Sequence, residues 1–246
     1  MPNLARTLLA PVLLVQGKRM FKTMPKLTAP SGAREGTRGT GDPLRFLLVG
    51  DSSAEGYGAE TQDDALLGHV VSRLAETHRV TWTLFARFGS TVPRTLAFLR
   101  KQEPEPFDVA LLAIGMNDVI AGQPLPAWLA SYRELVAELR ERFGVGHVVV
   151  SGMPLIGQFP AVPQPMRWVL GRQARRYDAA LEAWAEGERG VTYIGLGFAA
   201  DGALREGEVT VAEVMAADGF HPGPRVYDEW ARRAAEQIRA LQQTRQ

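Results

Sequence analysis

Short apolar runs alternate with helix-like segments from residue 44 onwards, and this alternation constrains the fold more than any other feature of the chain. Five runs have the length and the apolar or β-branched residues of buried strands: LRFLLVG (44–50), VTWTLFARFG (80–89), FDVALLAIG (107–115), HVVVSGMP (147–154) and VTYIGL (191–196). Segments with helical spacing separate these runs and follow the last one. Strands that alternate with crossover helices indicate a parallel sheet with helices on both faces.

The first residues of the chain do not continue this pattern. An apolar run from Leu8 to Val15 is preceded by Arg6 and followed by a basic cluster of Lys18, Arg19 and Lys22. The run is too short to span a bilayer as a helix, which takes about 20 residues. We expect a segment that docks on the domain or lies at a membrane surface with its basic flank towards the lipid head groups. A cleaved signal peptide is the alternative, although Pro11 interrupts the run and no small-x-small cleavage site follows.

Residues 29–43, APSGAREGTRGTGDP, are rich in Gly and Pro and predict a linker. We therefore divide the chain into an N-terminal segment with its linker, 1–43, and a domain, 44–246. The alternatives for the N-terminal segment leave a cytoplasmic, a peripheral-membrane and a secreted or periplasmic location open.

Composition excludes several classes of function. The formal net charge is +1, so there is no general electrostatic argument for a nucleic-acid partner. The chain has no Cys, which excludes disulfides, thiolate nucleophiles and Cys-ligated metals. Its 246 residues, 46% of them hydrophobic and 22% charged, are enough for one α/β domain with a sizeable core.

Polar, chemistry-bearing residues follow the predicted strands. The segments after the five strands contain, in order, GDSS (50–53), GST (89–91), GMND (115–118), SGMPLIGQFPAVPQP (151–165) and DGFHPG (218–223). The carboxyl ends of parallel strands meet at one edge of the sheet, where binding sites form. The groups gathered there are those that acyl transfer needs: a hydroxyl, a Gly amide, an Asn carboxamide, an Asp and a His. At this point either Ser52 or Ser53 qualifies as the nucleophile, and a turn or N-cap role is the alternative for both.

Position separates the four histidines. His69 and His78 lie in or at the end of a predicted helix, and His147 lies at the amino end of the fourth predicted strand. Only His221 lies at the carboxyl edge, and an imidazole is a suitable base near neutral pH. Asp218, three residues earlier, can hold Nδ1 of His221 and leave Nε2 for a serine. The alternative is a loop histidine that caps backbone groups.

Four segments of the chain resemble, in order, the four signature blocks of the SGNH (GDSL-type) hydrolases: GDSSAEGYG, FGST, GMND and DGFHP. The resemblance covers residues 44 to about 240. It implies a flavodoxin-like three-layer α/β/α fold with a five-stranded parallel sheet. It also selects Ser52 over Ser53 as the nucleophile, with His221 as the base and Asp218 as its carboxylate. The oxyanion donors that it implies are the amides of Ser52 and Gly89 and the side chain of Asn117.

The chain departs from the family pattern in two places. The first block reads GDSS rather than GDSL, and the second lacks the Asn that commonly precedes its Gly, so Gly89 is assigned from spacing and context. Two acidic residues next to the motifs, Asp51 and Asp118, are expected to fix turn geometry by accepting hydrogen bonds from backbone amides.

These roles predict a serine esterase that hydrolyses short to medium acyl carboxylic esters through an acyl-enzyme, without a metal or organic cofactor. The alternatives are a lysophospholipase or thioesterase, a carbohydrate O-acetylesterase and a non-catalytic SGNH-like binding module. The expected partner is a small-molecule or lipid ester, and no oligomeric state is predicted.

The loop from Met153 to Leu170 is unusually apolar for a surface connection. We expect it to form part of the acyl pocket, with Phe159 and Trp168 against the substrate. The alternative is a loop that folds down to cover a helix.

Overall fold

Six strands form a single sheet in the order β1-β3-β2-β4-β5-β6. The computed structural model describes residues 4–196 and 210–243. The strands are β1 (Glu35–Arg38), β2 (Asp42–Gly50), β3 (His78–Ala86), β4 (Val109–Ala113), β5 (His147–Ser151) and β6 (Val191–Ile194). Strands β2 to β6 pair in parallel, which confirms the predicted parallel sheet.

The sheet has one strand more than the five predicted. Strand β1 pairs antiparallel with β3 at the edge of the sheet, inside the Gly- and Pro-rich stretch that predicted a linker. Its residues, EGTR, are mostly exposed and carry no apolar pattern, so backbone pairing rather than side-chain burial holds the strand. Gly36 lies opposite Trp82, and a Cβ at this glycine would stand 2.6 Å from the Trp82 ring. The missing side chain therefore lets β1 approach the sheet.

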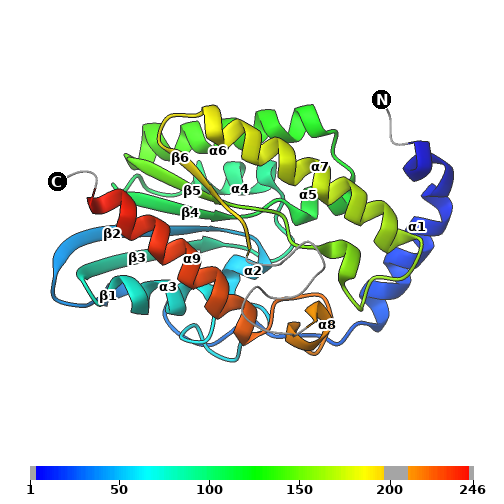
Figure 1. The fold of residues 1–246 in the computed structure, drawn as a ribbon, viewed down its shortest axis with the longest axis horizontal. Helices are drawn as coiled ribbons and strands as arrows, with labels where there is room; N and C mark the ends of the chain where they lie inside the picture. Colours follow the sequence, from blue (N-terminus) through cyan, green and yellow to red (C-terminus); the bar gives the residue numbers. More distant parts are fainter. Residues whose placement is uncertain (1–3, 197–209, 244–246) are drawn as a thin grey trace.

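Helices cover both faces of the sheet, as Figure 1 shows. One face packs against α4 (Val92–Leu99), α5 (Met116–Ala121), α6 (Leu125–Phe143) and α7 (Met166–Gly187), and the other against α3 (Leu66–Leu74) and α9 (Pro224–Gln243). Alternate residues of β2 serve the two layers: Leu47 and Val49 belong to the core under α6, and Phe46 and Leu48 to the core under α9. Burial on both faces explains why the strands read as continuous apolar runs.

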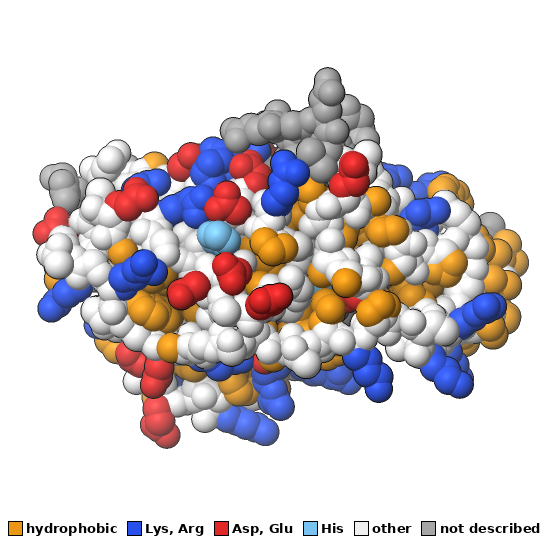
Figure 2. Space-filling model, turned by 90° about the horizontal axis from the view of Figure 1, so that it is seen from below, with side chains coloured by type: hydrophobic (Ala, Val, Ile, Leu, Met, Phe, Trp, Pro, Cys, Tyr) orange, Lys and Arg blue, Asp and Glu red, His pale blue; other side chains and the backbone are white. Residues whose placement is uncertain are grey.

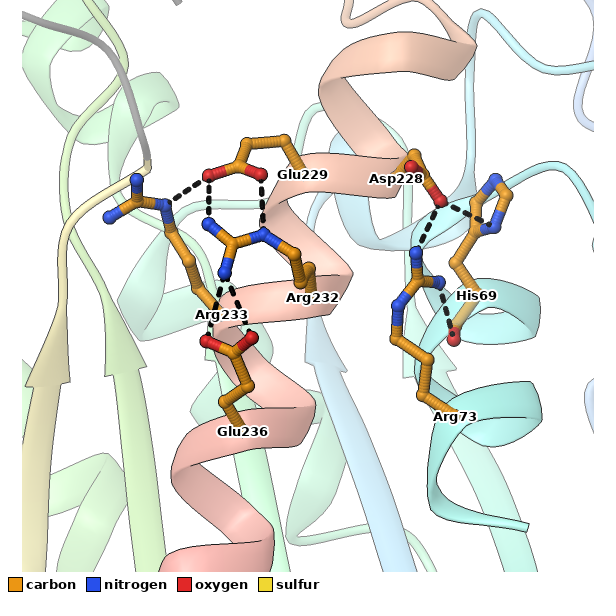
Figure 3. Close-up of polar contacts among 7 residues, drawn as sticks. All are labelled: His69, Arg73, Asp228, Glu229, Arg232, Arg233 and Glu236. Atoms are coloured by element: carbon orange, nitrogen blue, oxygen red, sulfur yellow. Dashed lines mark hydrogen bonds and ion pairs between the residues drawn. The ribbon is translucent and has the colours of Figure 1, made fainter. Parts of the chain in front are cut away.

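Charged side chains connect α9 to α3 on the outside of the molecule. Figure 2 shows acidic and basic side chains intermixed over the face seen from below in Figure 1. In Figure 3, a carboxylate oxygen of Asp228 accepts a hydrogen bond from Arg73 at 2.6 Å and lies 3.3 Å from Nδ1 of His69. Within α9, Glu229 pairs with Arg233 at 2.7 Å. Exposed ion pairs of this kind contribute about 0–1 kcal/mol each, so the apolar core beneath α9 is the main source of its attachment.

The N-terminal segment forms a helix, α1 (Leu4–Thr23), that lies beside α7 at one end of the molecule (Figure 1). The guanidinium of Arg6 donates hydrogen bonds to the carbonyls of Val119 and Ile120 at the end of α5, at 3.1 and 2.9 Å. Near the other end of α1, Met20 is buried in the core under α6 and α7. Among the helices that the structure describes, none is both long and apolar enough to cross a lipid bilayer.

Candidate active site

Ser52, His221 and Asp218 form one hydrogen-bonded row at the carboxyl edge of the sheet. Nε2 of His221 lies 3.0 Å from Oγ of Ser52, and Nδ1 of His221 lies 2.5 Å from Oδ2 of Asp218. All three residues are buried, at 4–7% exposure. The row has the order of a nucleophile, a base and an orienting carboxylate, and such a row is recognised by geometry rather than by sequence position.

The turn after β2 places Ser52 at the start of the short helix α2 (Ser52–Glu55). Asp51 caps this helix, because its Oδ1 accepts the amide of Ser53 at 3.0 Å. Gly56 ends the helix with φ +96°, a left-handed conformation that glycine adopts without steric cost. The four-residue helix therefore turns the Ser52 hydroxyl, and not that of Ser53, towards His221.

Asp218 is held by the turn that it begins. Its Oδ1 accepts the backbone amides of Phe220 at 3.0 Å and His221 at 2.9 Å, which leaves Oδ2 for the imidazole. Burial acts to raise the pKa of Asp218, but the hydrogen bonds from the His221 side chain and from these two amides outweigh it and hold the pKa below its ordinary value. The ionised carboxylate fixes the orientation of the His221 ring.

Asn117 lies at the start of α5 and lines the same cavity as Ser52 and His221. Its Nδ2 donates to Oδ2 of Asp51 at 3.2 Å and to the carbonyl of Ser90 at 3.0 Å. The GDSS and GMND motifs are therefore joined by a side-chain hydrogen bond, which fixes the carboxamide beside Ser52.

Gly89, the other predicted oxyanion donor, lies between two residues that contact the site. It lies on the loop after β3 with φ +67°, where it lines a separate hollow with Arg87 and Phe88. The ring of Phe88 lies 5.9 Å from that of His221, and the carbonyl of Ser90 accepts from Nδ2 of Asn117 at 3.0 Å. The second block of this chain lacks the Asn that commonly precedes its Gly, and the part of Gly89 in the oxyanion hole stays a prediction.

Three aromatic rings surround His221, and sequence reasoning did not assign them to the site. The rings of Tyr57 and Phe88 lie 5.7 and 5.9 Å from the imidazole, centroid to centroid, and the ring of Phe220 lies 5.3 Å away, edge to face. All three residues stand inside or next to the quoted motifs, so their positions in GYG, FGST and GFHP were the available signal. They limit the access of water to the base.

Beside Ser52 is a small cavity of about 50 Å³ with a largely apolar wall. Phe159, Met153, Met215 and Phe220 belong to that wall. The prediction that the loop after β5 approaches the serine therefore holds for Phe159, which is 4% exposed. It is wrong for Trp168, which is 46% exposed in the first turn of α7 and stacks under the guanidinium of Arg172.

Two buried carboxyl groups support the site. Burial raises the pKa of Asp51 to about 6 despite the hydrogen bonds from Ser53 and Asn117. Burial, and to a lesser extent the nearby charge of Asp51, raises the pKa of Asp118 to about 7. Both oxygens of Asp118 accept from the amide of Val92 at the start of α4, at 3.1–3.2 Å. The expectation that both residues fix turn geometry through backbone amides is confirmed.

The remaining histidines lie away from the site. His69 belongs to the α3–α9 ion pairs, His78 contacts the hydroxyl of Thr77 at 2.9 Å, and Nε2 of His147 lies 2.8 Å from the hydroxyl of Thr192. The choice of His221 by its position on the carboxyl edge therefore agrees with the geometry.

Most of the chain matches the model of a known protein family. The GDSL-like Lipase/Acylhydrolase family matches residues 48–229. The GDSL-like esterase Rv1075c of Mycobacterium tuberculosis is 29% identical over 191 residues, which cover 75% of this chain and 58% of that protein. The match thus spans less than two thirds of that relative's length.

Solved structures share the fold at low sequence identity. A lipolytic protein of the G-D-S-L family from Veillonella parvula superposes with a TM-score of 0.59 at 17% identity, covering 78% of this chain and 96% of that one. Axe2, an acetylxylan esterase from Geobacillus stearothermophilus, gives a TM-score of 0.57 at 19% identity, covering 81% and 95%. At these identities the likeness concerns the fold alone.

Proposed function

The chain belongs to the GDSL-like lipase/acylhydrolase family, as its four motifs predicted, and from this premise we propose that it is a serine esterase that hydrolyses short acyl carboxylic esters through an acyl-enzyme. The observation that carries the proposal is the row of hydrogen bonds from Ser52 through His221 to Asp218. A non-catalytic binding module would have no need of this arrangement.

In the proposed mechanism, Nε2 of His221 takes the hydroxyl proton of Ser52 as its Oγ attacks the ester carbonyl. Asp218 stabilises the imidazolium that forms. The oxyanion is stabilised by the Ser52 amide, which lies in the first turn of α2 where helical hydrogen bonds are not made, and by Nδ2 of Asn117. His221 then protonates the leaving alcohol. Water attacks the acyl-enzyme by the same route, which releases the acid and restores Ser52.

Asn117 already donates to Asp51 and Ser90, so one of these hydrogen bonds has to be shared with the oxyanion. One of its two contacts, to Asp51, is 3.2 Å long and is the weaker of the pair by distance. We propose that the developing oxyanion competes for this hydrogen. The amide of Gly89, on the loop between Phe88 and Ser90, is the third donor that we propose for the oxyanion hole.

The size of the cavity favours a short acyl group. Its volume of about 50 Å³ is a third of that of a cavity that binds benzene, at about 150 Å³. An acetyl or similarly short acyl group suits this space, and longer chains need Phe159 or another wall residue to move. The same observation favours carbohydrate O-acetyl esters as a second substrate class over long-chain lysophospholipids or thioesters.

The test is hydrolysis of chromogenic acetyl, butyryl, hexanoyl and octanoyl esters by the wild-type protein and by Ser52→Ala, with Ser53→Ala as the matched control. Ser52→Ala should lose at least about a thousandfold in turnover, the scale expected when a nucleophile is removed. Ser53→Ala should keep most of the activity. A serine-directed phosphonate should add to the peptide that contains Ser52.

Acetylated sugars, lysophospholipids and acyl thioesters complete the substrate panel. Near wild-type turnover in Ser52→Ala, or loss of activity in Ser53→Ala with Ser52→Ala intact, would contradict the assigned nucleophile. A preference for octanoyl over acetyl esters would contradict the short-acyl proposal and leave the nucleophile unaffected.

A further inference from the structure

Exposed large apolar side chains are concentrated on α1. Seven such side chains stand out among the residues that the structure describes, and five of them belong to this helix: Leu8, Val12, Leu14, Val15 and Phe21, at 45–72% exposure. Monomeric proteins rarely leave apolar side chains grouped in this way unless another surface covers them. We call Leu8, Val12 and Val15, together with Lys18, Arg19 and Lys22, the outer face of α1. Leu14 and Phe21 line the groove between α1 and the domain.

The outer face is distinct from the side by which α1 docks on the domain. Arg6 and Met20 are fixed to the domain by hydrogen bonds and by burial, and Leu13 packs against the same core. Leu8, Val12 and Val15 recur at intervals of four and three residues, so they share another side of the helix. Continuing that interval leads to Arg19 and Lys22, which are exposed. The side turned away from the domain therefore runs from apolar to basic.

The N-terminal segment that contains α1 is also more basic than the rest of the chain. Residues 1–34 contain six basic and no acidic side chains, whereas the whole chain has a formal net charge of +1. The rest of the protein is therefore net acidic. In Figure 2 hydrophobic side chains gather towards the right-hand end, where α1 lies in Figure 1, and basic side chains stand beside them. An anionic surface would attract this end of the molecule and repel the rest.

Helix α1 also adjoins the active site. The ring of Phe21 packs edge-on against the ring of Phe220, with their centroids 6.2 Å apart. Phe220 in turn lines the cavity of Ser52 and contacts His221. A surface that covers α1 would therefore lie next to a wall of the cavity that contains Ser52.

We propose that the outer face of α1 docks the protein on an anionic lipid bilayer. The helix lies in the plane of the membrane surface, with its apolar side chains at the boundary between head groups and acyl chains and its basic side chains against lipid phosphates. A second copy of the chain is a poorer occupant, because the same face of that copy offers basic side chains and no acidic partner for Lys18, Arg19 and Lys22. The proposal does not depend on which ester is hydrolysed.

The test is flotation of the full-length protein with phosphatidylcholine vesicles that do or do not contain phosphatidylglycerol. Wild-type protein should float with the anionic vesicles, and at least tenfold less of it with phosphatidylcholine alone or in high salt. The apolar variant Leu8→Glu/Val12→Glu/Val15→Glu and the charge variant Lys18→Glu/Arg19→Glu/Lys22→Glu should each lose binding at least tenfold.

The matched control is Arg79→Glu/Lys101→Glu/Arg133→Glu, which makes the same change in net charge at exposed residues elsewhere and should bind like the wild type. Circular dichroism and hydrolysis of a soluble acetyl ester check that every variant is folded. Wild-type protein that stays with the soluble fraction, or apolar and charge variants that bind as tightly as the wild type, would overturn the proposal. So would a dimer in solution that the apolar variant abolishes, because the face would then be an interface between copies. If the wild-type protein does not hydrolyse the soluble ester, that result contradicts the esterase proposal and leaves the membrane proposal unaffected.

Discussion

Asp51 links the nucleophile to the oxyanion donor through its two carboxylate oxygens. Oδ1 accepts the Ser53 amide and so shapes the turn that presents Ser52, and Oδ2 accepts from the carboxamide of Asn117. One buried side chain thereby sets the relative positions of Ser52 and Asn117, which follow two different strands. Sequence reasoning assigned Asp51 to turn geometry, which is half of what it does. The bond to Asn117 spans 66 positions and has no local signal.

Replacing Asn117 by Ala should lower kcat by about a hundredfold to a thousandfold, the scale seen when one oxyanion donor is removed. KM should change far less, because the hydrogen bond strengthens as negative charge develops on the substrate oxygen. Steady-state kinetics on the acetyl ester measure both constants, and the unfolding midpoint shows whether Asp51 and Ser90 tolerate the loss of their donor. An unchanged kcat with a raised KM would mean that Asn117 binds only the ground state.

Asp118 makes stability depend on pH. Its pKa is raised from 3.8 to about 7 in the folded protein, so the folded state favours the protonated form. The stabilisation from this group is complete below pH about 4 and is lost as the pH rises to about 7. In the variant Asp118→Asn the new side chain cannot ionise, and it keeps an oxygen that can accept from the Val92 amide. Its unfolding free energy relative to the wild type should therefore increase between pH 4.5 and pH 8, by a few kcal/mol at most. Urea unfolding at these pH values measures the difference, and a constant difference would contradict the assignment.

At the scale of elements, the hydrophobic pattern predicted the strands whose side chains are buried and missed the strand that is held by backbone pairing. The five parallel strands carry apolar runs because both of their faces are buried, and all five were predicted. Strand β1 has the polar sequence EGTR and is held by its hydrogen bonds to β3, so no side-chain pattern reveals it. The stretch from Met153 to Leu170 was interpreted as a loop throughout, although α7 begins at Met166. There, Met166, Val169 and Leu170 face the core at helical spacing while Trp168 does not.

Phe159 and Trp168 should therefore differ in their effect on specificity. Phe159→Ala enlarges the wall beside Ser52, and each additional methylene that it accommodates is worth about 0.8 kcal/mol, or nearly fourfold in kcat/KM. The ratio of hexanoyl to acetyl kcat/KM should rise about tenfold. Trp168→Ala, on the outer surface of α7, should leave this ratio unchanged. A common factor across all four esters in Phe159→Ala would place the acyl pocket elsewhere.

At the scale of the whole molecule, α1 joins the N-terminal segment to elements that lie more than a hundred residues away in the sequence. Arg6 reaches the end of α5 and the side chain of Gln173 in α7, and Phe21 reaches the turn that carries His221. Its apolar and basic composition was readable in the sequence, and docking on the domain was among the expectations. The sequence identified Arg6 only as a basic residue before the apolar run. Its acceptors are two backbone carbonyls and the side chain of the distant Gln173, and no sequence pattern marks them. The division at residue 43 stays a prediction.

Arg6→Ala tests how firmly α1 is attached. The guanidinium is partly buried and donates to Val119, Ile120 and Gln173 at 2.8–3.1 Å, and Gly122 leaves the space that it occupies, since a Cβ there would stand 2.2 Å from it. Removing this group takes one donor from each of three acceptors, so the unfolding free energy should fall by about 1–3 kcal/mol. The control Lys22→Ala removes an exposed cation and should stay within about 0.5 kcal/mol of the wild type. Urea unfolding of the full-length protein measures both. If Arg6→Ala is no less stable than Lys22→Ala, apolar contacts around Met20 alone hold α1 in place.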